Sequence, residues 1–189
     1  MSIISFQPKR HGDHRGWFSE TFRSDFVSHY VGNLSWVQDN QSFSQDSGTL
    51  RGLHFQVPPR VQSKLVRCLA GSIFDVCVDI RKVSPTYGKW IGVELSAENG
   101  KQLYIPEGFA HGFMTLQPDT MIFYKVSDYF VPECDRGLAW NDPTIAIEWP
   151  LKTGSPVLSA KDEKQPSFND FQSPFAYDGV QMSLTEVAL

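Results

Sequence analysis

The chain has 189 residues, a length typical of one domain with a sizeable core. Hydrophobic residues make up 41% of it and charged residues 20%, which is the composition of an ordinary globular protein. The formal net charge of -4, with no basic run, argues against broad nucleic-acid binding and leaves room for one local basic pocket.

The start of the chain, "MSIISFQPKRHGDHRG", has no apolar stretch behind a charged one, and no apolar run reaches the roughly 18 residues that span a membrane. The three cysteines, Cys68, Cys77 and Cys134, are widely spaced and form no CxxC pair. Such spacing indicates reduced thiols rather than disulfides or a metal site. The sequence therefore predicts a cytoplasmic protein that contacts neither a membrane nor nucleic acid.

The first predicted element is one short helix in "RSDFVSHYVG", where Ser24 would cap the N-terminus and Gly32 would end the helix. Farther along, "KLVRCLAGSIFDVCVDIRK" holds two strand-like runs joined at Ala70-Gly71-Ser72. Alternate positions of the second run share a face of the strand. One face holds Phe74, Val76, Val78 and Ile80, and the other holds Asp75, Cys77 and Asp79.

Further strands follow at short spacing. The segments "KWIGVELS", "KQLYIPEGFAHGFMTL" and "TMIFYKVSDYF" are separated by proline and glycine turns. Short strands with turn residues between them predict an all-β sandwich or barrel, and the lack of long amphipathic helices argues against a parallel α/β sheet. From about residue 141 the chain is rich in proline, serine and aspartate. We therefore expect a single domain, 1–189, whose irregular C-terminal segment packs over the barrel.

The segment "TLRGLHFQVPP" places an arginine and a histidine three positions apart on one strand. A histidine in apolar surroundings is most often a core residue with one hydrogen bond. In a regular strand Arg51 and His54 would point to opposite faces, but a bulge at Gly52 would turn both inward. Together with Lys64 at the start of the next strand, these residues favour a pocket that binds an anion and moves protons.

His111, in "IPEGFAHGF", adds a second histidine on a separate strand. Metal-binding cupin barrels use an HxH pair and a glutamate on one strand, with a third histidine on another. Here the first site reads His54-Phe55-Gln56, so only two imidazoles remain, with no carboxylate at ligand spacing. A transition-metal site usually needs at least three protein ligands. The sequence therefore predicts no metal, and it holds no glycine-rich phosphate loop that would indicate another cofactor.

The other candidate residues are dispersed, and each has an ordinary explanation when taken alone. They are Arg15, Glu20, Gln38, Asn40, Tyr124 and Asp162. The first four residue types are common among solvated surface and turn groups. Tyr124 lies in the apolar strand "MIFYKV" and would be a core tyrosine with its hydroxyl at the barrel edge, whereas Asp162 would be a surface residue.

Taken together, eight segments in this order resemble the dTDP-4-dehydrorhamnose 3,5-epimerases, which make L-rhamnose precursors. The segments are "GDHRGWFSE", "WVQDNQS", "LRGLHFQ", "KLVRCLAGSIFDVCVDIRKVSPTYGKW", "LYIPEGFAHGF", "YKVSDYF", "WNDPTIAIEWP" and "LSAKD". The resemblance spans Gly12 to Asp162, almost the whole chain. It implies a cupin-like jelly roll with short helices, and a homodimer with strands shared between subunits, in keeping with the high aromatic content of 13%.

The resemblance also implies roles for individual residues. His54 matches the proton-abstracting histidine, Asp162 its paired aspartate, Tyr124 the proton-donating tyrosine and Lys64 the lysine near the sugar carbonyl. The positions that match those holding the nucleotide sugar are Arg15, Glu20, Gln38, Asn40, Arg51, His111 and Lys161. Asp135 stands where some members carry a binding glutamate, and Phe130 stands where many carry a second tyrosine.

The expected reaction is epimerisation at C3 and C5 of dTDP-4-dehydro-6-deoxy-D-glucose, without a cofactor. The C4 ketone acidifies both positions because the carbanion spreads onto its oxygen, so a histidine base and a tyrosine acid on opposite faces suffice. Two alternatives stay open: an epimerase that inverts only C3 or only C5 of a related nucleotide 4-keto sugar, and a non-catalytic cupin that binds a nucleotide sugar.

Overall fold

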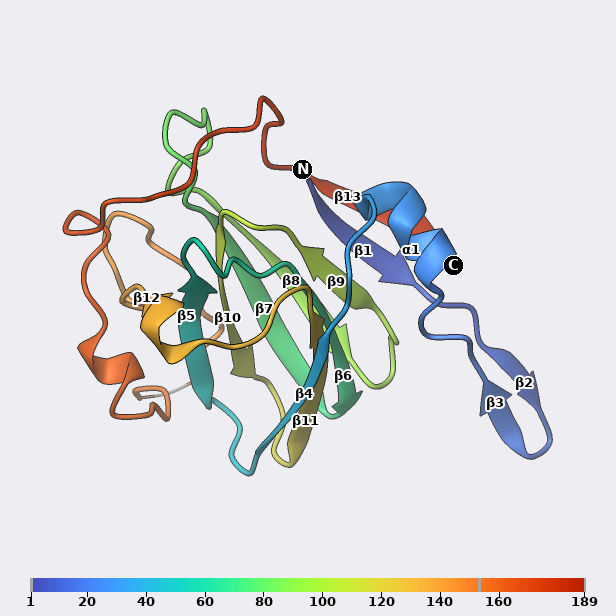
Figure 1. The fold of residues 1–189 in the computed structure, drawn as a ribbon. Helices are drawn as coiled ribbons and strands as arrows, with labels where there is room; N and C mark the ends of the chain where they lie inside the picture. The colour runs from blue at the N-terminus through green and yellow to red at the C-terminus, as the bar shows by residue number, and fades with distance from the viewer. Residues whose placement is uncertain (1, 153, 189) are drawn as a thin grey trace.

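The computed structural model describes residues 2–152 and 154–188 and consists mainly of strands (Figure 1). One sheet contains β1 (Ile3–Gln7), β4 (Gln38–Ser44), β6 (Lys64–Ala70), β9 (Gln102–Ile105), β11 (Thr120–Val126) and β13 (Leu184–Ala188). The second contains β5 (Leu50–Gln56), β7 (Ser72–Asp79), β8 (Trp90–Ser96), β10 (Phe109–Thr115) and β12 (Asp135–Gly137). The remaining elements are β2 (His11–Asp13), β3 (Gly16–Phe18), α1 (Ser24–Val31), and the short 3₁₀ helices η1 (Pro132–Cys134) and η2 (Asp162–Lys164).

The strand order is β13-β1-β9-β6-β11-β4 in the six-stranded sheet and β12-β5-β10-β7-β8 in the five-stranded one. Neighbouring strands are antiparallel except β1 and β13, which run parallel. Strands β6 and β7 are separated only by Gly71, at a φ of +72°, yet they lie in different sheets. This two-sheet arrangement is a cupin-like jelly roll, so the predicted fold class is confirmed.

The main hydrophobic core lies between the two sheets. It combines Val66 and Leu103 of the six-stranded sheet with Ile73, Cys77 and Val93 of the five-stranded sheet. The predicted alternation along β7 is confirmed, because the apolar face belongs to a second cluster on the other side of that strand. Both faces of the five-stranded sheet are therefore buried, which explains why β7 contains apolar residues at most positions.

The C-terminal segment covers the outer face of the five-stranded sheet. Ile145, Phe168 and Phe175 are buried in the same cluster as Val76 and Val78 of β7. The chain then returns to the other sheet, where β13 adds a parallel strand to the edge of β1 (Figure 1).

Helix α1 packs on the outer face of the six-stranded sheet, where Val27 and Val31 share a buried cluster with Phe6 of β1. Gly32 ends the helix at a φ of +79°, as predicted. The predicted cap was wrong: Arg23 is the N-cap residue and Ser24 is the first helical residue, with no side-chain cap bond. No helix in the described part of the chain is long and apolar enough to cross a bilayer.

Strands β2 and β3 form a hairpin that projects away from the sandwich (Figure 1). Its second strand, β3, carries two aromatic side chains that are mostly exposed, Trp17 at 59% and Phe18 at 70%. Such exposure of large aromatic groups is typical of a surface that another molecule covers.

Candidate active site

A bulge in β5 brings Arg51 and His54 to the same cavity. His54 lies opposite His111 of β10, and Arg51 lies opposite Phe113. The two positions are three residues apart on β5 and two residues apart on β10, so β5 contains one extra residue, which is a β-bulge. Both Arg51 and His54 line one cavity, as expected from the glycine between them. Gly52 has a φ of +126°, and a Cβ there would lie 2.5 Å from the Cα of Gly112, so a larger residue does not fit.

His54 is paired with Asp162, a residue 108 positions later in the chain. Its Nε2 lies 2.6 Å from Oδ1 of Asp162, and the Ser159 hydroxyl donates to Oδ2 over 2.8 Å. Burial alone would raise the pKa of Asp162, but the hydrogen bonds from His54 and Ser159 outweigh it and lower the pKa. The carboxylate therefore stays ionised and fixes the orientation of the imidazole.

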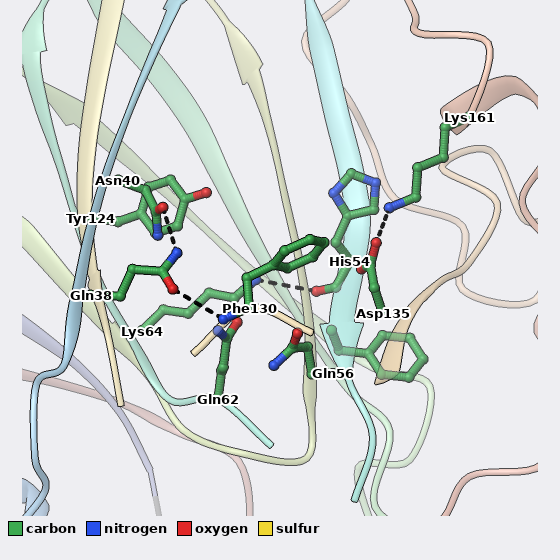
Figure 2. A pocket seen from close by; sticks show the side chains of 11 residues that line it. Gln38, Asn40, His54, Gln56, Gln62, Lys64, Tyr124, Phe130, Asp135 and Lys161 are labelled. Atoms are coloured by element: carbon green, nitrogen blue, oxygen red, sulfur yellow. Dashed lines mark hydrogen bonds and ion pairs between the residues drawn. The ribbon is translucent and has the colours of Figure 1, made fainter. Parts of the chain in front are cut away.

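Two adjoining cavities lie between the sheets and share His54, Lys64 and Tyr124. The first, of about 350 Å³, is lined by Gln38, Asn40, His54, Phe55, Gln56, Gln62, Lys64, Tyr124, Phe130, Asp135 and Lys161 (Figure 2). The second, of about 240 Å³, is lined by Ser42, Arg51, His54, Lys64, His111, Phe113, Tyr124, Ser159 and Asp162. Together they provide the concave, mixed polar and apolar space that a small-molecule site needs.

Tyr124 reaches this space from the opposite sheet. It lies on β11, paired with Asn40 of β4, whereas His54 lies on β5 of the five-stranded sheet. Figure 2 places Tyr124 and Asn40 on one side of the cavity and His54 on the other. Burial raises the pKa of Tyr124, and the nearby Arg51 opposes that rise. The phenol therefore carries its proton at neutral pH.

Lys64 and His111, which line the second cavity, lie near the buried side chain of Asp75. Nε2 of His111 lies 2.9 and 3.0 Å from the two carboxylate oxygens of Asp75, which is fully buried. Burial lowers the pKa of Lys64 to about 8, against the opposing effect of Asp75. Burial likewise lowers the pKa of His111, and again Asp75 opposes it. A cation and a carboxylate thus lie next to a neutral imidazole.

Polar side chains surround the rest of the first cavity. The Gln38 amide donates to Oδ1 of Asn40 over 2.8 Å and accepts from the Phe130 backbone over 3.0 Å. Lys161 makes an ion pair with Asp135 (Figure 2). In the second cavity, Arg51 donates to the Ser44 hydroxyl over 3.3 Å. These amides and cations suit the base, sugar and diphosphate parts of a nucleotide sugar.

Two predicted residues do not reach the site of their own chain. Arg15 follows β2, forms an ion pair with Asp13 and has a side chain that is 79% exposed. Glu20 is 59% exposed and lies 3.7 Å from Arg23. The structure brings together the other nine predicted residues, His54, Tyr124, Asp162, Lys64, Gln38, Asn40, Arg51, His111 and Lys161.

Sequence reasoning missed several residues that line the cavities. Ser42, Gln56, Gln62, Phe113 and Ser159 were not predicted. The signals for two of them were available: Ser159 stands three positions before Asp162, and Ser42 shares a strand face with Asn40. Asp162 itself is only 4% exposed, so its interpretation from the residue alone as a surface group was wrong.

Within the residues described, no group of three or more histidine, cysteine, aspartate and glutamate side chains is arranged to hold a metal ion. A reaction without metal or other cofactor stays a prediction from the sequence.

Comparisons with known proteins agree on one family. The family model for dTDP-4-dehydrorhamnose 3,5-epimerase matches residues 2–170. The enzyme of that name from Sinorhizobium fredii is 54% identical over 171 residues, covering 90% of this chain and 87% of that protein. The one from Shigella flexneri is 50% identical over 169 residues, covering 89% and 92%.

The structural comparison leads to the same family. The crystal structure of dTDP-6-deoxy-D-glucose-3,5-epimerase from Legionella pneumophila, in complex with dTDP-4-keto-L-rhamnose, superposes with a TM-score of 0.86 at 44% sequence identity. The match covers 92% of each chain.

Proposed function

The chain belongs to the dTDP-4-dehydrorhamnose 3,5-epimerase family, and on that premise we propose that His54 and Tyr124 act on opposite faces of its substrate. The enzyme is an isomerase that epimerises C3 and C5 of dTDP-4-dehydro-6-deoxy-D-glucose, giving dTDP-4-dehydro-L-rhamnose. The observation that carries the assignment of roles is that His54 and Tyr124 line the same two cavities from opposing sheets.

His54 removes the proton. With Nε2 bonded to the Asp162 carboxylate, which only accepts, the hydrogen lies on Nε2 and the lone pair on Nδ1. Nδ1 is therefore the basic atom. When it takes a proton from C3 or C5, the resulting imidazolium is stabilised by Asp162, as in other histidine–carboxylate pairs.

Lys64 and Tyr124 complete the reaction. Deprotonation next to the C4 ketone moves charge onto the C4 oxygen, and the Lys64 ammonium stabilises that enolate inside a partly buried cavity. Tyr124 then delivers its phenolic proton to the opposite face of the carbon. Before the second centre is inverted, His54 releases its proton to solvent and the tyrosinate recovers one.

The remaining residues of the two cavities bind the nucleotide part of the substrate and orient its sugar. Arg51 and Lys161 supply positive charge for the diphosphate, His111 contacts the sugar, and Gln38 and Asn40 present amides at the mouth. Arg15 and Glu20 bind the substrate of a second copy of the chain, because both lie on or next to a hairpin that leaves its own sandwich.

A homodimer with exchanged hairpins accounts for further features of the outer surface. Trp17 and Phe18 are exposed on strand β3 of the hairpin, and Nε of Arg67 is buried on the outer face of β6 without a hydrogen-bond partner among the described residues. A second copy would cover the aromatic groups and offer an acceptor to Arg67. Sedimentation at micromolar concentration should give twice 21.4 kDa, and a clean monomer would exclude the dimer.

The number of domains and the cellular compartment are also part of the proposal. The chain acts as one domain, 1–189, because the segment from about residue 141 packs on the jelly roll rather than forming a separate core. Cytoplasmic localisation is supported by Cys68, Cys77 and Cys134, which are free thiols in the described structure.

The test of the reaction is proton exchange. Incubation with dTDP-4-keto-6-deoxyglucose in D₂O, followed by NMR at C3 and C5, should show deuterium at both carbons together with inversion of both. Inversion and exchange at one carbon only would identify a mono-epimerase. Binding without any exchange would identify a nucleotide-sugar sensor and overturn the proposal.

The test of the two faces is Tyr124→Phe. This variant keeps the base and the shape of the cavity, so His54 still removes a proton, trades it with solvent and returns it to the same face. Inversion should fall by about 10² to 10⁴ while deuterium still enters the sugar with its configuration retained. Loss of exchange along with inversion, with the substrate still bound, would contradict the assignment of Tyr124.

A further inference from the structure

Ser42 is an unusual residue of the site, because its hydroxyl is buried and unpaired. Among the buried side-chain nitrogen and oxygen atoms of the described residues, two lack a hydrogen-bond partner, and these are Oγ of Ser42 and Nε of Arg67. Arg67 lies on the outer face of β6, away from the reaction. Ser42 lines the same cavity as Arg51, His54 and Tyr124.

The position of Ser42 in β4 is fixed by its neighbours. It pairs with Ile122 of β11, two residues along from the pair of Asn40 with Tyr124. Because alternate residues share a face, the side chains of Ser42, Asn40 and Tyr124 all point between the sheets. The Ser42 hydroxyl thus stands on a paired strand, next to the proposed proton donor.

The next inward-facing residue of the strand provides a contrast. The Ser44 hydroxyl accepts a hydrogen bond from Nε of Arg51 over 3.3 Å. A serine hydroxyl in this part of the strand can therefore find its hydrogen-bond partner within the protein. Ser42 has no such partner in the described chain. Since a buried hydroxyl without a partner destabilises the folded state, a residue of this kind is expected where a ligand supplies the missing bond.

The sugar of the substrate has few groups that could hydrogen-bond the Ser42 hydroxyl. A 4-keto-6-deoxyhexose carries ring hydroxyls only at C2 and C3, because C4 is a ketone and C6 a methyl group. The C3 hydroxyl changes sides when C3 is inverted, whereas the C2 hydroxyl keeps its configuration throughout. A serine held on a paired strand matches the group that does not change its configuration.

We propose that Ser42 hydrogen-bonds the C2 hydroxyl of the sugar and thereby selects 2-hydroxy over 2-deoxy 4-keto sugars. The inference rests on the proposed function, since it places the sugar ring between His54 and Tyr124. Ser42 is a specificity residue and takes no part in proton transfer. When a 2-deoxy sugar binds, the Ser42 hydroxyl has no C2 hydroxyl to bond and stays buried without a hydrogen bond, which disfavours that substrate.

The experiment compares two substrates with two variants. kcat/KM is measured for wild type, Ser42→Ala and Ser44→Ala, with dTDP-4-keto-6-deoxyglucose and with its 2-deoxy analogue. Ser42→Ala should lose about 5- to 10-fold on the 2-hydroxy substrate and nothing on the 2-deoxy one, as expected for one neutral hydrogen bond. Ser44→Ala, which releases Arg51, should weaken both substrates to the same extent.

Stability separates this role from a structural one. Ser42→Ala removes a hydroxyl that has no partner, so its urea unfolding midpoint should equal or exceed that of wild type. Ser42→Cys, nearly the same size with a weaker donor, should give the same substrate pattern and serves if the alanine variant folds poorly.

Two results would overturn the assignment. Equal losses on both substrates would mean that Ser42 acts elsewhere on the ligand, and no loss on either would mean that it contacts nothing. Failure of the wild type to exchange or invert the 2-hydroxy substrate would instead overturn the proposed function, so the two failures are distinguishable.

Discussion

Two histidines that lie opposite each other on neighbouring strands of one sheet are each paired with an aspartate. His54 of β5 pairs with Asp162, and His111 of β10 pairs with Asp75, at Nε2–Oδ1 distances of 2.6 and 2.9 Å. The two histidines are directly opposed in the register of β5 and β10. Both pairs therefore join an imidazole Nε2 to an aspartate carboxyl group.

The surroundings of the two pairs differ. The His54 side chain is 29% exposed, whereas that of His111 is 9% exposed, with Asp75 at 0%. Asp162 comes from an irregular segment and is held by Ser159, while Asp75 is part of β7 and influences Lys64. A partly open pair can exchange protons with a substrate and with solvent. A closed pair beside a lysine mainly sets the charge of its neighbours.

The largest difference between the two pairs is expected in activity when each histidine is replaced by alanine. His54→Ala should reduce both deuterium exchange and inversion by about 10⁴, because no other base is aligned with Asp162. His111→Ala is the matched variant and should raise KM while exchange continues. NMR in D₂O measures both. If exchange survived in His54→Ala and disappeared in His111→Ala, the roles of the two pairs would be reversed.

Replacing the aspartates should give a smaller difference in the same direction. Asp162→Asn keeps the size of the side chain but no longer stabilises the imidazolium, so kcat should fall by about 10² or more. Asp75→Asn should leave kcat at its optimum pH much closer to wild type, since Asp75 does not contact the base. Steady-state kinetics at several pH values decides this, and equal losses of kcat would remove the distinction.

Arg51→Ala tests whether Arg51, which the β5 bulge turns into the cavity that His54 also lines, binds the diphosphate. A diphosphate contact is made equally in the ground state and the transition state, so its loss raises KM and leaves kcat nearly unchanged. A charge-assisted bond of about 1.5 to 3 kcal/mol corresponds to roughly a 10- to 150-fold increase. A collapse of kcat with KM unchanged would instead indicate that Arg51 stabilises the enolate.

The smallest predicted effect is in the pH profile. Burial lowers the pKa of Lys64 to about 8, and the enolate needs the ammonium form, so activity should be present below pH 8 and fall as pH rises through it. Asp75 opposes this lowering, so Asp75→Asn should move the alkaline limb to lower pH. Near neutral pH the change in rate is less than about 10-fold, because one pH unit changes the protonated fraction at most tenfold.

Lys64→Arg provides the control for that limb, because the guanidinium keeps its charge far above pH 8. Its profile should lose the limb near pH 8, even if its maximum is lower. An unchanged limb in both Lys64→Arg and Asp75→Asn would assign the titration to another group.

Much of this architecture was predictable from local patterns. The alternation of β7 follows from its apolar and polar spacing, and the glycine between Arg51 and His54 predicted the bulge that the register contains. The same local reasoning was wrong for Ser24, because a serine next to the start of a helix can be its first residue rather than its cap. It was wrong for Asp162 because nothing in the nearby sequence indicates that the aspartate is buried.

By itself, the amino-acid sequence determined the strands, the turns and, through eight ordered segments, the family. The family resemblance predicted that Asp162 pairs with His54 and that Tyr124 acts from the opposite face. Only the tertiary structure decided that the Ser159 hydroxyl holds Asp162 and that Tyr124 stands on the opposing sheet. It also decided that the Ser42 hydroxyl is buried without a partner among the described residues. The physical reason is that strand periodicity depends on neighbours two residues away. The site depends on contacts between distant segments, and these exist only once the two sheets have closed on a common core.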